Sequence, residues 1–167
     1  WHSFERILQY VIISQASTIA YSKPLGSILL NDLGVVNPHW MGSVPRIWEA
    51  VRAGVFGSMK KTGGVKAALF FFFTKVASIY AKNRDLLFGQ VATFNKRNRV
   101  ADILRSFLPA TLLYPLYRLG DILVFSKVRE KLGTSFIAGV SGGGSLSEGV
   151  DLFFDSIGIK LFDGYGL

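Results

Sequence analysis

Two glycine-rich segments near the end of the sequence have residue types that could hold a nucleotide. The first, SGGGSL, covers residues 141–146, and the second, DGYGL, covers 163–167. Three consecutive glycines carry no Cβ atoms, so a flat ligand can approach the backbone closely. Tyr165, between two glycines, could stack an aromatic base on its ring. Spacing alone allows a nucleotide-like site or two tight turns without a ligand, because neither segment matches a dinucleotide fingerprint or a P-loop.

The elements around these segments predict that both lie at one edge of a parallel sheet. SFIAGV (135–140) and IKLF (159–162) have the pattern of buried strands, with a helix between them that runs to Ser156. Ser145 and Glu148 have the S-x-x-E spacing of a capping box, which predicts that this helix begins there. In an open parallel sheet ligands bind beyond the carboxyl ends of the strands, where both segments fall.

The first part of the chain alternates predicted helices and strands. Helices are expected over residues 4–16, after Pro24 and after Pro45, and strands over 18–22 and 39–44. This alternation is typical of an α/β unit with a parallel sheet.

The middle of the chain interrupts that alternation with two long helical stretches. One begins at Gly63-Gly64 and the other after a basic segment at 95–99. Pro109 and Pro115 are expected to kink or divide the second. Neither is expected to cross a membrane, because charged residues interrupt both and about 20 mostly apolar residues are needed.

The predicted fold class is therefore α/β, a layered arrangement with a mostly parallel sheet flanked by helices, plus a helical insertion over about residues 60–132. Residues 1–167 are expected to form a single partial domain, with α/β parts at 1–59 and 133–167 on either side of the insertion.

The net charge of +8 is concentrated in the insertion, because residues 60–105 contain ten Lys and Arg against two Asp. Phenylalanine fills positions 70–73. Residues 60–125 could form a membrane-surface element whose basic residues meet anionic lipid. They could equally form a helical pair packed on the core with a solvated basic face. We expect no nucleic-acid partner, since contiguous phenylalanines at helical spacing are mostly buried.

Metal and disulfide chemistry have little support in the composition. The chain has no cysteine, which excludes a disulfide scaffold and a Cys-based metal site. Its two histidines, His2 and His39, are too few for a zinc cluster. His39 lies outside any motif and is expected to be structural.

Several short motifs together resemble the adenylate-forming (AMP-binding) superfamily. SGGGSL and DGYGL resemble the SGG-A-P-L and GYGLTET pair of that family. WHSFER (1–6), AYSKP (20–24) and VPRIWE (44–49) resemble its long-chain fatty acid–CoA ligase branch, the long-chain acyl-CoA synthetases. The resemblance implies two steps: ATP and a fatty acid give an acyl-adenylate and pyrophosphate, and the CoA thiol then displaces AMP.

The resemblance also implies roles for individual residues. His2 would lie near the carboxylate as the catalytic residue. Trp1, Phe4 and Gly142 would line the acyl chain. The residues implied to bind the nucleotide are Gly142, Gly143, Gly144, Asp163, Gly164, Tyr165, Gly166 and Leu167. Where the family usually has Ala-Pro this chain has Gly144-Ser145, and we expect Ser145 to cap the helix instead.

The implied substrates and cofactors are a fatty acid, ATP, CoA and Mg²⁺, with the magnesium ligand in a Thr-Glu-Thr expected beyond Leu167 and no metal ligand within the chain. The phosphate loop, the remainder of the domain and a small C-terminal domain are likewise expected outside it, so these residues alone are expected to be inactive. The expected localisation is cytoplasmic, peripheral on the inner face of a membrane if the insertion binds lipid. Two alternatives stay open: an adenylate-forming ligase for another carboxylic acid, and a noncatalytic membrane-associated interaction domain.

Overall fold

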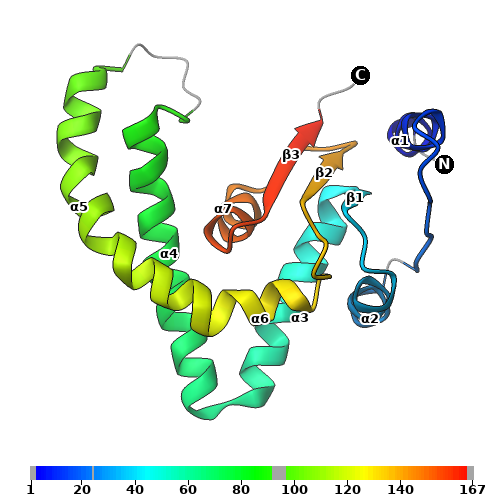
Figure 1. Ribbon diagram of the computed structural model, residues 1–167, viewed down its shortest axis with the longest axis horizontal. Helices are drawn as coiled ribbons and strands as arrows, with labels where there is room; N and C mark the ends of the chain where they lie inside the picture. Colours follow the sequence, from blue (N-terminus) through cyan, green and yellow to red (C-terminus); the bar gives the residue numbers. More distant parts are fainter. Residues whose placement is uncertain (1–2, 24, 92–96, 165–167) are drawn as a thin grey trace.

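The structure is a computed structural model that describes residues 3–23, 25–91 and 97–164. It confirms the predicted α/β class, with a three-stranded sheet flanked by helices (Figure 1). In chain order the elements are α1 (Ser3–Ser14), α2 (Gly26–Val36), β1 (Trp40–Ser43), α3 (Pro45–Thr62), α4 (Gly64–Phe88), α5 (Arg99–Gly120), the π-helix η1 (Asp121–Phe125), α6 (Ser126–Glu130), β2 (Ala138–Gly142), α7 (Glu148–Ser156) and β3 (Lys160–Gly164).

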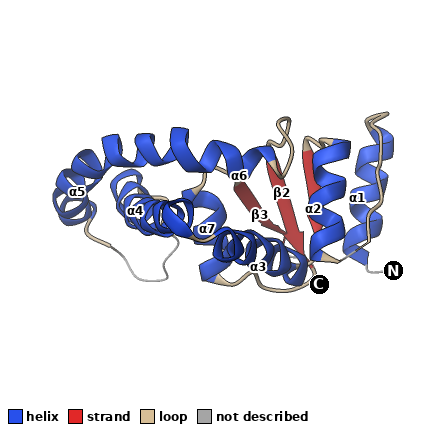
Figure 2. Cartoon of the chain, turned by 90° about the horizontal axis from the view of Figure 1, so that it is seen from below, coloured by secondary structure: helices blue, strands red, loops and turns tan. Residues whose placement is uncertain are grey.

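The sheet has the order β1-β2-β3, and both neighbouring pairs are parallel. Because side chains alternate across a strand, the central β2 presents Gly139 to one face and Gly142 to the other. A Cβ on Gly139 would overlap the Trp48 ring, so α3 covers the first face. A Cβ on Gly142 would overlap the Phe4 ring, so α1 crosses the second face. Figure 2 shows α1 on the opposite side of the strands from α7.

The hydrophobic core joins the sheet helices to the insertion through aromatic rings. Trp48 of α3, Phe70 of α4 and Phe154 of α7 are fully buried. The rings of Trp48 and Phe154 meet edge to face, with centroids 5.4 Å apart. Phe56 contacts both Phe70 and Phe153 in the same manner, at 5.3 and 5.2 Å. Such pairs add to the gain from burying their area, which makes these rings the main anchor between the two parts.

Ion pairs also connect the insertion to the α/β part. Arg84 of α4 contacts Asp155 of α7 at 2.5 Å and its own neighbour Asp85 at 2.8 Å. Arg129 of α6 donates to Asp121 of η1 and to the backbone carbonyl of Ile157, both at 2.6 Å. These side chains are partly buried, so solvent screens the pairs less than it screens surface pairs. Figure 1 shows α5 running alongside α4 on the side away from α1.

Two local predictions were wrong. Residues 18–22 form no strand. The backbone over 17–23 is irregular and the side chains are mostly exposed, so no neighbouring strand pairs with the backbone N–H and C=O groups there. The helix after SGGGSL begins at Glu148, with Ser147 as N-cap and no side-chain capping bond, so Ser145 is not its cap. Leu146 packs against the core instead.

The prolines of the insertion were expected to kink or divide the second helical stretch, and the structure excludes division. Helix α5 continues through Pro109 and Pro115 and is not divided at either. The irregularity comes later, where Gly120 packs directly on the Phe73 ring and the π-helix η1 follows. Packing along α4 therefore outweighs the intrinsic cost of the prolines.

Candidate functional site

The carboxyl ends of β2 and β3 bring the two glycine-rich segments together. Ser141 pairs with Asp163, and Gly142 pairs with Gly164 in the parallel register. Both strands are longer at this end than predicted and include the first residues of each segment. Gly143 then adopts a φ of 79°, which glycine tolerates and other residues rarely adopt. The predicted neighbourhood is therefore present, and the ligand roles of its residues stay predictions.

Helix α1 lies directly over the glycines of this edge. A Cβ on Gly142 would overlap the Phe4 ring, and a Cβ on Gly42 of β1 would overlap the Leu8 side chain. On Gly164 an added Cβ would lie 3.5 Å from the Phe4 ring. The glycines thus allow an aromatic side chain to approach the sheet closely, which fits the acyl role predicted for Phe4 and Gly142.

The α1 face of this edge offers no open slot for a purine. There, Phe4 occupies the space that the missing Cβ of Gly142 leaves. A nucleotide at this edge is therefore expected beside Phe4 and not in its place. None of the residues of α1 is buried, so little packing holds α1 in position. At Gly144 the surroundings are more open, since an added Cβ would meet Pro45 only at 3.7 Å.

Ser141 is a candidate that the sequence analysis did not single out. It is fully buried, and its hydroxyl has no hydrogen-bond partner among the described residues. A buried hydroxyl without a partner costs about 1–3 kcal/mol, so Ser141 is a candidate for contact with a bound group. Its position at the start of SGGGSL was the available signal, but sequence gives no measure of burial.

Replacing Ser141 by alanine separates a ligand role from a structural one. We expect the free energy of unfolding to stay the same or rise by up to about 1 kcal/mol, because the unpaired hydroxyl is removed. If the hydroxyl binds nucleotide, the KM for ATP of the complete protein should rise roughly tenfold, which is the effect of losing one hydrogen bond to a charged group. Urea denaturation and steady-state kinetics measure the two quantities. Lower stability with an unchanged KM would assign Ser141 to the fold alone.

Acidic side chains surround the start of α7 near this edge. Packing around Asp151 raises the pKa of its carboxyl above the usual range, and the neighbouring carboxylates of Asp155 and Asp163 add to that rise. Glu148 lies in the same first turn. Acidic groups therefore already face the positive end of the helix dipole.

Asp151→Asn tests this electrostatic assignment. The raised pKa means that the folded chain binds the Asp151 proton more tightly than the unfolded chain, so ionisation lowers stability as pH rises above about 3.8. We expect the variant to have a higher melting temperature than the parent at pH 7, and no advantage below pH 3.8. Asp155→Asn, which removes the partner of Arg84, should instead lower the melting temperature. An advantage of Asp151→Asn that is the same at every pH would contradict the assignment.

Several predicted site residues lie outside the described part of the chain. They are Trp1, His2, Tyr165, Gly166 and Leu167. Within the described ranges, no group of three or more His, Cys, Asp or Glu side chains is arranged to hold a metal ion. His39 takes part in backbone pairing, since its carbonyl accepts from the Ile137 N–H at 2.8 Å.

Comparison with known proteins gives whole-length matches among curated relatives. The chain is 32% identical over 172 residues to the probable acyl-activating enzyme 16, chloroplastic, of Arabidopsis thaliana, covering 100% of the chain and 23% of the relative. It is 31% identical over 172 residues to the Arabidopsis long-chain-fatty-acid–[acyl-carrier-protein] ligase AEE15, chloroplastic, with the same coverage. Long chain acyl-CoA synthetase 6, peroxisomal, of the same plant is 28% identical over 167 residues, covering 99% of the chain and 20% of the relative.

Over its whole length the chain is thus homologous to part of the acyl-activating enzymes, in agreement with the resemblance that its motifs carry. The relatives include named long-chain acyl-CoA synthetases, which agrees with the expected branch. The chain spans about a fifth to a quarter of the length of these relatives. No family model matches it, and no solved structure does.

Proposed function

We propose that this chain is part of the large domain of an ATP-dependent long-chain fatty acid ligase. The observation that carries the proposal is the register of β2 and β3, which places Gly142 beside Gly164 at the ligand-binding edge of a parallel sheet. The whole-length similarity to named fatty acid ligases supports the same assignment.

In the proposed reaction the fatty acid carboxylate attacks the α-phosphorus of ATP, and pyrophosphate leaves. The thiol of the acceptor then attacks the acyl carbonyl carbon and loses its proton, and AMP leaves. These steps depend more on holding the reactants in line and on neutralising the developing charge than on a protein nucleophile.

We assign the residues of this chain to positioning roles. Trp1, Phe4 and Gly142 line the acyl chain, and His2 lies near the carboxylate. The buried Ser141 hydroxyl donates to the nucleotide. Residues 142–144 and 163–167 form the wall along the adenine and approach the α-phosphate. Mg²⁺, when bound, supplies charge neutralisation at the phosphates through ligands outside these residues.

The thiol acceptor is either CoA or an acyl carrier protein, since relatives are named for each. To test the function, the complete reading frame that contains these residues is assayed with palmitate, ATP and Mg²⁺. AMP release that requires palmitate and one of the two thiols supports the proposal. AMP release that instead requires a medium-chain or aryl acid would favour an adenylate-forming ligase for another carboxylic acid. No acid-dependent release at all would favour the noncatalytic interaction domain.

The outer face of α5 supports an anionic membrane surface as a further partner of this protein. An apolar stripe there repeats at helical spacing and is solvent-exposed; it consists of Val100, Leu104, Phe107, Leu108, Leu112 and Leu119. Leu104 and Leu112 are 73% and 66% exposed. Arg105 next to this stripe makes no hydrogen bond or salt bridge to a described residue. Apolar side chains flanked by arginine suit the lipid interface, where each cation contributes about 1 kcal/mol.

Helix α4 is apolar as well, but part of its surface is buried in the core. By length and composition it is the one described helix that could cross a membrane. One of its faces is nevertheless in the core, where Phe70, Phe73 and Ala77 are buried. We therefore propose docking through α5, with α4 as its support.

Vesicle flotation tests the membrane partner. We expect the complete protein to float with vesicles of phosphatidylcholine and phosphatidylglycerol. Leu104→Ser/Leu108→Ser should reduce the bound fraction at least tenfold because it removes two exposed apolar contacts at the middle of the stripe. Val65→Ser, which removes one exposed apolar side chain of α4 and leaves the stripe intact, is the control. Equal flotation of all three proteins, or none of any, would remove the membrane from the proposal.

A further inference from the structure

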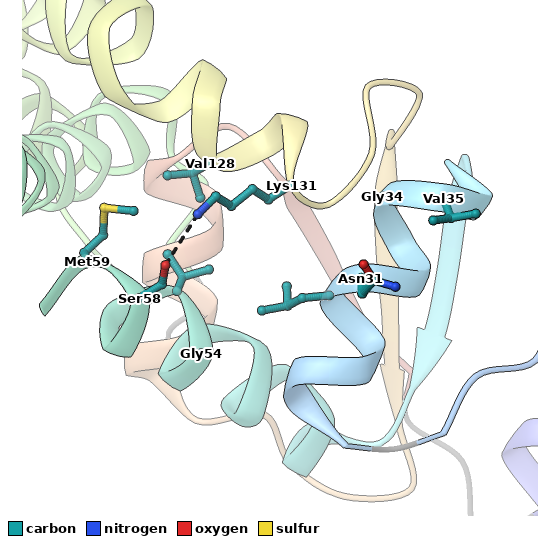
Figure 3. Close-up of a pocket in the computed structure, with 10 residues that line it drawn as sticks. Asn31, Gly34, Val35, Gly54, Ser58, Met59, Val128 and Lys131 are labelled. Atoms are coloured by element: carbon teal, nitrogen blue, oxygen red, sulfur yellow. Dashed lines mark hydrogen bonds between the residues drawn. The ribbon is translucent and has the colours of Figure 1, made fainter. Parts of the chain in front are cut away.

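A cavity of about 370 Å³ lies between α2, α3 and α6, away from the glycine-rich edge (Figure 3). Helix α3 begins at the carboxyl end of β1, and the residues that it contributes to the cavity, 54–59, follow about ten residues later. At about 1.5 Å per residue they lie roughly 15 Å from that edge. On the other side, Asn37 at the end of α2 accepts from the Ser135 N–H at 2.8 Å, just before β2 begins. The cavity is therefore near the starting ends of the strands.

The lining of this cavity is aliphatic. Leu30, Val35, Val55, Met59 and Val128 supply apolar side chains, and no aromatic ring is among the described residues that line it. Gly34 and Gly54 leave part of the wall without side chains (Figure 3). Because the lining offers no ring to stack on, and methionine adapts to flexible chains, the cavity suits an alkyl chain better than a flat ligand.

One of the described residues that line this apolar cavity is a cation, Lys131. Lys131 is the single charged side chain among the described lining residues, and its ammonium points to the Ser58 hydroxyl at 3.4 Å (Figure 3). Asn31 adds an exposed amide to the lining. A single positive charge with two neutral hydrogen-bonding groups matches one carboxylate.

We propose that this cavity is a second binding site, which takes a carboxylate with a short linear alkyl chain. The chain lies over Val55, Met59 and Val128, and the carboxylate accepts hydrogen bonds from Lys131 and Ser58. The site is separate from the proposed ligase site and does not depend on that function, so a carboxylate bound here is positioned to act on the fold of α2 and α3 rather than on the reaction.

The test is a titration of the complete protein with sodium octanoate at pH 7, followed by hydrogen–deuterium exchange of its peptides. We expect saturable protection of residues 30–35, 54–59 and 128–131. Octanol, which keeps the alkyl chain and lacks the charge, should bind at least fivefold more weakly. Protection that within this chain appears only at residues 99–123 or 138–164 would place octanoate on α5 or at the glycine edge and overturn the assignment, as would no saturable protection.

Two variants and a matched control sharpen the result. Gly34→Leu fills the cavity. The helix should accept the leucine, because an added Cβ at this position has open space and the φ of Gly34 is an ordinary helical one. We expect at least a tenfold loss of octanoate affinity. Gly57→Leu makes the same change on α3 at a helical glycine with equally open surroundings outside the lining, and should bind as the parent does. Lys131→Gln should bring octanoate affinity down to that of octanol. Unchanged octanoate affinity in Gly34→Leu or in Lys131→Gln would contradict the proposal.

Discussion

Gly142→Val is expected to lower the fatty-acid-dependent AMP release of the complete protein at least 100-fold. A Cβ at this position overlaps the Phe4 ring, so valine forces α1 away from the carboxyl ends of β2 and β3. Displacement by about 1 Å of groups that position reactants can cost on the order of 10²-fold in rate. The fold itself should tolerate the change, because valine is favourable in a strand and α1 has no buried residues. We therefore expect a near-normal melting temperature together with the loss of activity.

Two further variants show whether the contact with Phe4 is the cause. Phe4→Ala/Gly142→Val removes the ring that valine would strike, and should recover part of the lost activity. Gly149→Val adds the same side chain at a glycine of α7 with open surroundings and should leave activity within about twofold. Full activity of Gly142→Val would show that the close approach of α1 to the glycines has no part in the reaction.

Trp48→Ala is expected to lower the free energy of unfolding by about 3–5 kcal/mol. The side chain is fully buried between the sheet and α7, and its ring meets Phe154 and Phe136 edge to face. Truncation loses the transfer free energy of the ring and leaves a cavity beside Gly139, which has no side chain to fill it. Since whole domains are stable by only about 5–15 kcal/mol, the variant should melt roughly 10 °C lower or fail to fold.

Trp48→Phe serves as the comparison. The indole Nε1 has no hydrogen-bond partner among the described residues, so phenylalanine removes an unpaired polar group while keeping most of the apolar volume. We expect a loss below about 2 kcal/mol, measured by urea denaturation. Equal losses for the two variants would mean that the ring contributes little beyond its indole nitrogen.

The strands and most helices could be predicted from sequence because their patterns are local. The helical period of α7 and the Gly158 that ends it agree with the structure, where Gly158 has a φ of 81°. Residues 18–22 have strand composition but lack a neighbour in the described sheet, and pairing is a property of the whole fold. Likewise the continuity of α5 through two prolines depends on its packing against α4, which composition cannot show.

The glycines of the site could be predicted from the sequence, but the helix that lies over them could not. Adjacency of the segments at 141–146 and 163–167 follows from parallel strands, which sequence pattern indicates. The position of Phe4 over Gly142 depends on where α1 crosses the sheet, more than 130 residues away in sequence. The burial of Ser141 is also a tertiary property, so an ordinary serine gave no signal of its unpaired hydroxyl.

The location of the nucleotide is tested most directly by photolabelling the complete protein with 8-azido-ATP in the presence of palmitate. Trypsin releases residues 132–160 as one peptide and cuts again before Leu161, so both glycine-rich segments fall on identifiable peptides. We expect label on these two peptides, reduced by excess ATP. Label that ATP displaces only from peptides within residues 7–60, or from peptides outside this chain, would contradict this location.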